Sequence, residues 1–543
     1  MGIHLALFIF LASLRMTSCQ NVEHGLVQVD GVQAIAEIDD NFICATIDWW
    51  PHEKCDYNYC PWGNSSLLNL DLSHPFLAKA IQGLYMMGKL AIMTLSQAFE
   101  DKSWRFFARP SAVSGRKFEV PLSSISKDER AIVTFGLNAL HGRHQISHTV
   151  WGGDWDTSNA YDLINYTISK GYKIDSWEFG NELSGKGIGA SVGATQYGKD
   201  LIKLKEILHK LYKKSKFKPS LVAPGGFYSK EWFDKLLKVT GPGIVNVLTH
   251  HVYNLGAGNN EHLERKILDP ERLSKVESIF GNLSETIKKY GPWSSAWVGE
   301  SGGAFNSGGR NVSNTFVDSF WYLDQLGIAS RYNTKVYCRQ TLIGGNYGLL
   351  DTTTFIPNPD YYRQVALLWH QLMGKTVLAA SSDVFSPSLR TYAHCSKGRD
   401  GMTLLLINLS NQTHFTLMVH DRVPVSNGGN ENAKSIHKEK SFLSHLKSAF
   451  SWIGTKGSDL TFREEYHLTP KDDYLKSQTM LLNGIPLELT NDGEIPTLNP
   501  VLKSVHSPIY LDPLSIAFIV FPNFDAQACA GTDIENFNRK AYP

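Results

Sequence analysis

The strongest constraint on the fold is a repeated alternation along the first two thirds of the chain. Between residues 41 and 374, short apolar, β-branched runs alternate with longer stretches whose apolar residues recur at helical spacing. This alternation is typical of parallel β–α units. Seven runs are clear, and an eighth is expected near 90–95; the seven are 42–48, 131–139, 174–182, 220–226, 245–253, 296–303 and 335–345. We therefore predict an α/β protein with a (β/α)8 barrel over residues 41–374, although the alternation alone would also fit an open sheet.

After about residue 375 the pattern changes. Short strand-like runs, among them 403–409 and 515–521, are separated by Asn, Gly and Pro, and no long helical period links them. This texture predicts an all-β sandwich domain over residues 375–543. The early run 26–38 has no helix after it, so we expect residues 20–40 to add a strand to that sandwich.

The N-terminus and the sequons indicate an exported protein. Residues 5–14 are apolar and small residues follow, which predicts a signal peptide over residues 1–19. Six Asn-X-Ser/Thr sites predict N-glycosylation; they are Asn64, Asn165, Asn282, Asn311, Asn408 and Asn411. We expect secretion to the cell wall, or delivery to the vacuole or lysosome through the same route.

Composition limits the partners. Six cysteines remain after the signal peptide, and in an oxidising compartment they predict disulfides, with the pairing left open. No CxxC spacing suggests a metal site, and no cofactor is expected. The net charge of +1 argues against a nucleic-acid binder, and no later apolar run approaches the length of a transmembrane segment. We expect a monomer.

Two glutamates at strand ends suggest the chemistry. Glu182 closes the motif Trp-Glu-Phe-Gly-Asn-Glu, and Glu300 lies in Trp-Val-Gly-Glu-Ser-Gly-Gly. Glycoside hydrolysis needs two carboxyl groups on opposite sides of one sugar bond, and a barrel presents such groups at the C-terminal ends of its strands. We predict Glu182 as general acid/base and Glu300 as nucleophile, with Asn181 contacting the sugar 2-hydroxyl. The alternative is that each glutamate only caps the helix that follows.

Other residues near strand ends are candidate substrate contacts. His250 and His251 are adjacent, so in a strand their side chains point to opposite faces and only one can line the cleft; His250 is the predicted contact. Asp48 follows the first strand, and Gln340 lies in the last. Tyr347, just beyond it, could contact the nucleophile or the substrate, or could pack in the core.

Longer stretches resemble plant heparanase-like members of glycoside hydrolase family 79. They include CATIDWWPHEKC, IDSWEFGNELSG, THHVYNLG, WVGESGGAFNSGG and VYCRQTLIGGNYGLLD. The resemblance implies a (β/α)8 barrel with a β-sandwich, a retaining mechanism and β-glucuronide substrates. It makes Glu182 the proton donor and Glu300 the nucleophile, and it assigns Ser307, Gly308 and Tyr347 to the substrate's carboxylate.

The stretch 82–130 departs from the family pattern, which leaves the second barrel strand open. The leading hypothesis is a secreted β-glucuronidase that acts on acidic glycans or glucuronide conjugates. The alternatives are an endo-β-glucuronidase acting on a polysaccharide, and a carbohydrate-binding protein that has lost catalysis through the altered 82–130 stretch.

Overall fold

The computed structural model describes most of the chain. The described residues are 21–48, 50, 53–66, 69–71, 74–77, 80, 90–92, 131–361, 366–421, 462–490, 493–494 and 496–530. The expected signal peptide (1–19) and most of the stretch 82–130 lie outside them.

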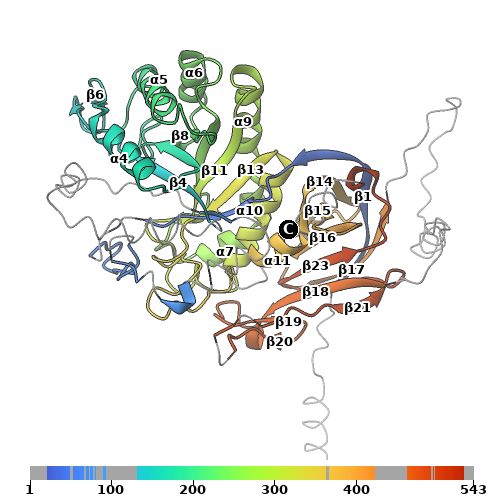
Figure 1. The fold of residues 1–543 in the computed structure, drawn as a ribbon. Helices are drawn as coiled ribbons and strands as arrows, with labels where there is room; N and C mark the ends of the chain where they lie inside the picture. The colour runs from blue at the N-terminus through green and yellow to red at the C-terminus, as the bar shows by residue number, and fades with distance from the viewer. Residues whose placement is uncertain are drawn as a thin grey trace, which may run out of the picture.

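Eight parallel strands pair in a closed ring. Figure 1 shows several of them at the upper left, with helices on their outer side. Going round the ring they are β11 (Ser295–Ser301), β13 (Thr334–Arg339), β2 (Ile43–Ala45), β3 (Leu90–Ile92), β4 (Ala131–Leu137), β7 (Ser176–Phe179), β8 (Ser220–Phe227) and β9 (Val247–Val252). The short β3 pairs with β2 on one side and β4 on the other. The second strand that the sequence left open is therefore present.

Helices follow most of the barrel strands. They are α4 (Ser158–Ser169), α5 (Ala194–Leu211), α6 (Lys230–Thr240), α7 (Leu263–Ile267), α8 (Pro270–Ser274), α9 (Glu277–Tyr290), α10 (Asp318–Arg331) and α11 (Ala366–Leu372).

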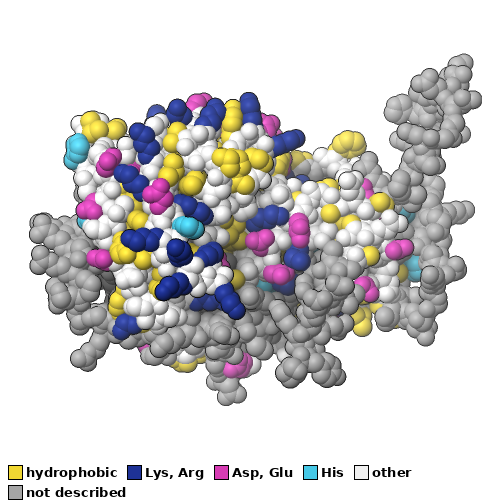
Figure 2. All heavy atoms as spheres, turned by 45° about the horizontal axis from the view of Figure 1, so that its top comes forward, with side chains coloured by type: hydrophobic (Ala, Val, Ile, Leu, Met, Phe, Trp, Pro, Cys, Tyr) yellow, Lys and Arg dark blue, Asp and Glu magenta, His cyan; other side chains and the backbone are white. Residues whose placement is uncertain are grey.

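Lysines occupy the last turns of α5, α6 and α9, where they complement the helix dipoles. Figure 2 shows many Lys and Arg side chains over this part of the surface. None of the described helices is both long and apolar enough to cross a membrane.

Two small ladders sit among the barrel loops. One pairs β5 (His144–Gln145) with β6 (Trp151–Gly152). The other pairs β10 (Gly256–Ala257) with β12 (Ala304–Phe305), so it joins the loops that follow β9 and β11. The second ladder fixes the start of the loop that carries Ser307 and Gly308.

The remaining strands form one continuous eleven-stranded sheet, where the sequence predicted a sandwich. β1 (Asn21–Glu37) pairs antiparallel with β14 and parallel with β17. The others are β14 (Met373–Ser382), β15 (Leu389–Ser396), β16 (Met402–Asn408), β17 (Thr413–Asp421), β18 (Phe462–Pro470), β19 (Met480–Leu482), β20 (Ile485–Pro486), β21 (Val501–Ser504), β22 (Ile509–Leu511) and β23 (Ser515–Phe521).

The central strands β16 and β23 of this sheet are buried on both faces. Side chains alternate between faces along a strand, and in β16 Leu404 and Leu406 join one core while Leu405 and Ile407 join the core that continues into the barrel. An unbroken apolar strand is the result, because neither face meets water. The sheet is thus packed directly against the barrel.

Helix α10 lies between the barrel and the sheet, and it is buried from Asp318 to Ser330 (Figure 1). Arg390 of β15 bonds its Asp324 through Nε at 2.7 Å, and Tyr392 donates to the same carboxylate at 2.6 Å. His394 bonds Ser330 at 3.1 Å. These contacts fix the sheet on the side of the barrel.

Three disulfides resolve the open cysteine pairing. Cys44–Cys338 joins neighbouring strands β2 and β13, Cys395–Cys529 ties β15 to the C-terminal segment, and Cys55–Cys60 closes a short loop after β2.

The structure contradicts one of the predicted glycosylation sites. Asn408 is fully buried, and its amide nitrogen donates to the carbonyl oxygens of Thr413 and Asp512 at 2.8 Å each. A glycan would have to occupy that nitrogen, so the prediction for Asn408 is wrong. The other five asparagines are exposed and remain predictions.

Candidate active site

The two glutamates come together at the C-terminal end of the barrel. Glu182 follows β7 and is partly exposed, whereas Glu300 lies near the end of β11 and is buried. A carboxylate oxygen of each lies within 4.8 Å of the other and of a ring nitrogen of His251. Residues 118 positions apart in sequence thus face a single small space.

Strand β9 and the residue directly after it supply two further residues of this cluster, His251 and Tyr253. His251 Nδ1 lies 2.9 Å from a carboxylate oxygen of Glu182 and 3.9 Å from one of Glu300. The hydroxyl of Tyr253 donates to the other oxygen of Glu300 at 2.7 Å. Neither residue was predicted from the sequence as a site residue. In extended backbone, two residues spaced by two point to the same face, and this spacing could have predicted that His251 and Tyr253 lie together.

The predicted contact His250 points the other way. Its Nδ1 lies 3.1 Å from the backbone oxygen of Trp297, and its ring packs edge-on against Phe280 of α9. Burial lowers the pKa of His250 to about 3, so it is a neutral core histidine. The prediction that His250 lines the site is therefore wrong, and it is His251 that lies against the two glutamates.

The cluster holds protons unusually tightly. Burial raises the pKa of Glu300 to about 8; the cation at His251 opposes this shift, while the carboxylates of Glu182 and Asp48 add to it. The pKa of His251 is raised to about 9, because the attraction of the Glu300 and Glu182 carboxylates outweighs its burial. A proton on Glu300 and a cationic imidazole at His251 are therefore both favoured at neutral pH.

This protonation bears on metal binding. Glu182, His251 and Glu300 offer three ligand atoms close together, as a metal site would. Imidazole binds a metal only in its neutral form. An ion at this position would therefore have to displace the proton that the raised pKa of His251, about 9, favours on the imidazole.

Strands β2 and β13 bring Asp48 and Gln340 to the same end. The side-chain amide of Gln340 donates to Asp48 and its oxygen accepts from Thr46, both through short hydrogen bonds. Tyr347 is buried, and burial next to Asp48 and Glu300 raises its pKa well above the usual range, so it stays a phenol. Trp49, which follows Asp48 in the sequence, lies outside the described residues.

The loop after β12 makes a left-handed turn. Asn306, Ser307 and Gly308 have φ values of 59°, 67° and 75°. Asn346 binds two carbonyl oxygens of the turn. Its backbone N–H donates to Ser307 O at 2.7 Å, and its side-chain amide donates to Gly308 O at 3.1 Å. Within the described part of the chain, no acceptor bonds the backbone N–H of Ser307 or Gly308.

Tyr347 packs against this turn and against the strand end that carries Glu300. A Cβ atom on Gly308 would lie 2.8 Å from the Tyr347 ring, and one on Gly302 would lie 3.0 Å from it. The two glycines therefore let the backbone approach the ring closely. The predicted residues Ser307, Gly308 and Tyr347 are thus gathered beside Glu300.

A hydrogen-bond chain beneath the site leads to the backbone of Glu182. Thr249 donates to the buried carboxylate of Glu178 at 3.1 Å and accepts from Gly225 N–H at 2.8 Å. The carbonyl of Gly225 accepts from Glu182 N–H at 2.6 Å. Glu182 has a φ of 53°, a backbone conformation that non-glycine residues rarely adopt. The hydrogen bonds from Glu178 to Glu182 N–H hold the backbone of Glu182 in this conformation. The side-chain oxygen of Asn181, buried beside it, has no hydrogen-bond partner within the described residues.

Comparison with solved structures shows which class of protein has this fold. A 4-O-α-L-rhamnosyl-β-D-glucuronidase from Fusarium oxysporum 12S matches with a TM-score of 0.59 at 14% identity, over 92% of this chain and 100% of that chain. At this identity the likeness shows only that the two chains share a fold.

The family follows from the sequence. The model for the glycosyl hydrolase family 79 N-terminal domain matches residues 24–104 and 105–327, and the chain belongs to this family. It is 55% identical over 534 residues to Heparanase-like protein 1 of Arabidopsis thaliana (95% and 96% of the two chains), and 36% identical over 519 residues to Baicalin-beta-D-glucuronidase of Scutellaria baicalensis (90% of each). The two matched segments together also cover the stretch 82–130, which was predicted to depart from the family pattern. They meet after residue 104, inside this stretch.

Proposed function

We propose that this glycoside hydrolase cleaves β-glucuronide linkages of acidic glycans or glucuronide conjugates with retention of configuration. The observation that carries the proposal is the approach of the Glu182 and Glu300 carboxyls to within 4.8 Å. Retaining enzymes hold their two carboxyl groups about 5 Å apart, whereas inverting enzymes leave room for a water molecule between them. In this proposal residues 41–374 form the complete (β/α)8 catalytic barrel, and the sheet is a domain attached to it.

The first step is attack by Glu300 on the anomeric carbon while Glu182 protonates the leaving oxygen. One new bond joins the Glu300 oxygen to the sugar, and the aglycone leaves with the proton that Glu182 donates. Tyr253 donates to the attacking carboxylate and orients it. In the second step Glu182, now ionised, takes a proton from water, and this water releases the sugar from Glu300.

Selectivity for glucuronate rests on the turn at Ser307. The backbone N–H groups of Ser307 and Gly308 have no acceptor among the described residues, and together with the Tyr347 phenol beside them they suit a carboxylate. Asn181, with a buried oxygen available, suits a sugar hydroxyl. The baicalin-cleaving relative supports the same substrate class by its name.

The test is hydrolysis of 4-nitrophenyl β-D-glucuronide. We expect Glu300→Gln and Glu182→Gln to lower kcat at least about 10³-fold, since each loses a group that acts directly at the bond. Glu231→Gln on the exposed face of α6 is the matched control and should keep full activity. Wild-type activity in either active-site variant would refute the assignment. Measurable glycan binding without turnover by the wild-type protein would favour a carbohydrate-binding role instead.

We also propose export through the secretory route, with glycans on Asn64, Asn165, Asn282, Asn311 and Asn411, and a monomeric state. The three disulfides and the exposure of these asparagines support this.

A further inference from the structure

A disulfide-closed loop follows the first barrel strand. Cys55 and Cys60 are joined, and Asp56 and Tyr59 between them pair through two backbone hydrogen bonds of 2.8 and 3.0 Å. Tyr57, within the turn, has positive φ. The disulfide thus constrains a tight turn at the same end of the barrel as Glu300.

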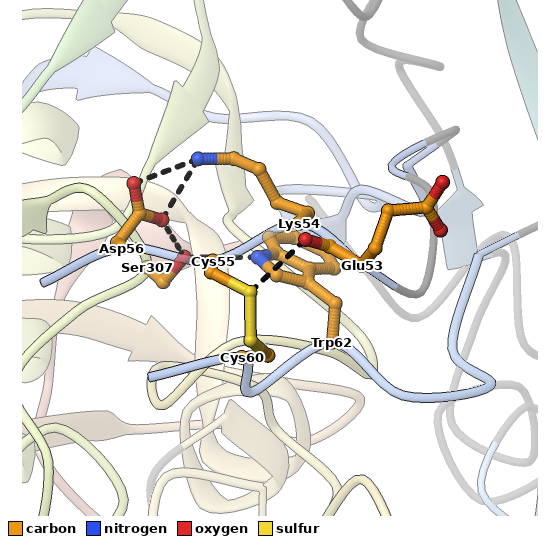
Figure 3. Close-up of a disulfide and its surroundings, with 7 residues drawn as sticks. All are labelled: Glu53, Lys54, Cys55, Asp56, Cys60, Trp62 and Ser307. Carbon is orange, nitrogen blue, oxygen red and sulfur yellow. Dashed lines mark hydrogen bonds and ion pairs between the residues drawn. A yellow bond between two sulfur atoms is a disulfide. The ribbon is translucent and has the colours of Figure 1, made fainter. Parts of the chain in front are cut away.

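This loop contacts the turn that carries Ser307 (Figure 3). The Ser307 hydroxyl donates to the Asp56 carboxylate through a short hydrogen bond and accepts from Trp62 Nε1 at 2.9 Å. Next to it, the Asn306 side chain donates to the Tyr57 hydroxyl at 3.1 Å. A further contact stacks Arg310 over the Tyr59 ring, 4.6 Å from its centroid. Three contacts from the Cys55–Cys60 loop, and one from Trp62 just beyond it, thus reach a turn some 250 residues later in the sequence.

The charges at this junction are balanced. Asp56 places a carboxylate against a turn that we propose binds another carboxylate, and the two would repel each other. Lys54 neutralises Asp56, because its Nζ lies 2.8 Å from both carboxylate oxygens. Lys54 in turn lies over the Trp50 ring at 4.8 Å.

We propose that the Cys55–Cys60 loop is a specificity element for the acidic sugar. Asp56 and Trp62 hold the Ser307 side chain by hydrogen bonds, and the Ser307 and Gly308 N–H groups, which no described acceptor bonds, are left for the substrate's carboxylate. Lys54 cancels the charge that this support introduces. These are positioning residues, and the inference rests on the proposed β-glucuronidase function.

The disulfide itself is the exposed one of the three. Both Cys55 and Cys60 are exposed. In the other two disulfides, Cys44, Cys338 and Cys395 are buried and Cys529 is half-buried. Access governs thiol–disulfide exchange. A mild reductant should therefore open the Cys55–Cys60 loop first and act on substrate selectivity before it affects the fold.

The experiment compares 4-nitrophenyl β-D-glucuronide with the corresponding uncharged glucuronamide. The readout is the ratio of the two kcat/KM values, which a general loss of stability would not change. For Cys55→Ser/Cys60→Ser and for Asp56→Ala we expect KM for the glucuronide to rise about tenfold with little change in kcat, because hydrogen bonds to a charged group are weakened. The ratio should fall accordingly, while the glucuronamide constants stay near wild type.

Charge variants sharpen the test. Lys54→Met leaves Asp56 unpaired and should raise KM for the glucuronide alone, whereas Lys54→Met/Asp56→Asn removes both charges and should restore it. Cys395→Ser/Cys529→Ser is the matched disulfide control, and it should lower stability without changing the ratio.

The outcomes separate the two proposals. A folded Cys55→Ser/Cys60→Ser variant with the wild-type ratio overturns the specificity element. If that variant does not fold, Lys54→Met decides, and an unchanged ratio there overturns it equally. A wild-type protein that cleaves neither substrate would instead contradict the proposed function.

Discussion

The barrel and the sheet treat buried polar groups in opposite ways. In the sheet, Arg463 uses all three guanidinium nitrogens, bonding Glu465 and the carbonyl oxygens of Ser504, Ser507 and Pro508. Among the described residues, every buried side-chain nitrogen or oxygen that lacks a hydrogen bond precedes β14. Several, including Asn181 Oδ1, His251 Nε2 and Glu300 Oε2, lie around the glutamate pair.

The difference is what a binding site requires. An unpaired buried polar atom costs stability, about 1–3 kcal/mol by typical measurements. A scaffold avoids that cost, as the sheet does, whereas a site keeps such atoms for a ligand. Polar groups at the end of the barrel should therefore matter for catalysis, and those of the sheet for stability.

Two tyrosines test this contrast directly. Tyr253 donates to Glu300 at 2.7 Å and Tyr392 donates to Asp324 at 2.6 Å, so the two hydroxyls make similar bonds in different regions. We expect Tyr253→Phe to lower kcat about 10²-fold, since it removes a donor to the reacting carboxylate. Tyr392→Phe should keep kcat and lose about 2 kcal/mol of unfolding free energy. Steady-state kinetics and urea denaturation measure both, and equal kinetic losses would contradict the contrast.

The chain beneath Glu182 predicts a leaving-group effect. Thr249→Val removes the link between Glu178 and Gly225, and so loosens the backbone that holds Glu182, the proposed acid catalyst. We expect kcat to fall about tenfold for glucuronides with poor leaving groups and little for 4-nitrophenyl glucuronide, which needs less protonation. Thr249→Ser keeps the hydroxyl and should behave as wild type. A loss of the same size for both substrates would indicate a merely structural role.

The raised pKa of Glu300 predicts the pH profile. Glu300 attacks as a carboxylate in the proposed mechanism, and burial together with the neighbouring carboxylates raises its pKa to about 8. Below that pH part of the enzyme holds a proton on the nucleophile, so kcat/KM should rise as pH increases toward about 8. A profile measured between pH 4 and 10 tests this, and a kcat/KM that falls steadily between pH 5 and 8 would contradict it.

The smallest expected effect concerns two neighbouring asparagines of the sheet. Asn411 is exposed, whereas the amide of Asn408 is fully bonded. Asn411→Gln should remove one glycan with little change in stability. Asn408→Gln should remove none, and should lower stability by about 2 kcal/mol because its buried bonds are lost. Intact mass before and after deglycosylation reports the glycans, and a glycan on Asn408 would show that the sheet is packed differently.

Much of the barrel could be predicted from local pattern. Each of the seven clear runs contains a strand, and the weak run near residue 90 contains β3. Glu182 and Glu300 could be chosen because parallel strands end at one face of a barrel. Local pattern could not decide between His250 and His251, since alternation says only that they diverge and the choice depends on which face packs against α9.

Long-range contacts account for the rest. The pairing of Cys44 with Cys338 depends on β2 meeting β13, which only ring closure provides. Tyr253 and the loop at Asp56 were missed because their partners lie 47 and 251 residues away. Asn408 was mistaken for a glycan site because the motif contains no information about burial.

The stereochemistry of the reaction tests the central claim most directly. Proton NMR can identify the anomer of glucuronic acid first released from 4-nitrophenyl β-D-glucuronide, before mutarotation. If Glu300 and Glu182 act as nucleophile and acid/base across one bond, the β-anomer appears first. First release of the α-anomer would contradict the account.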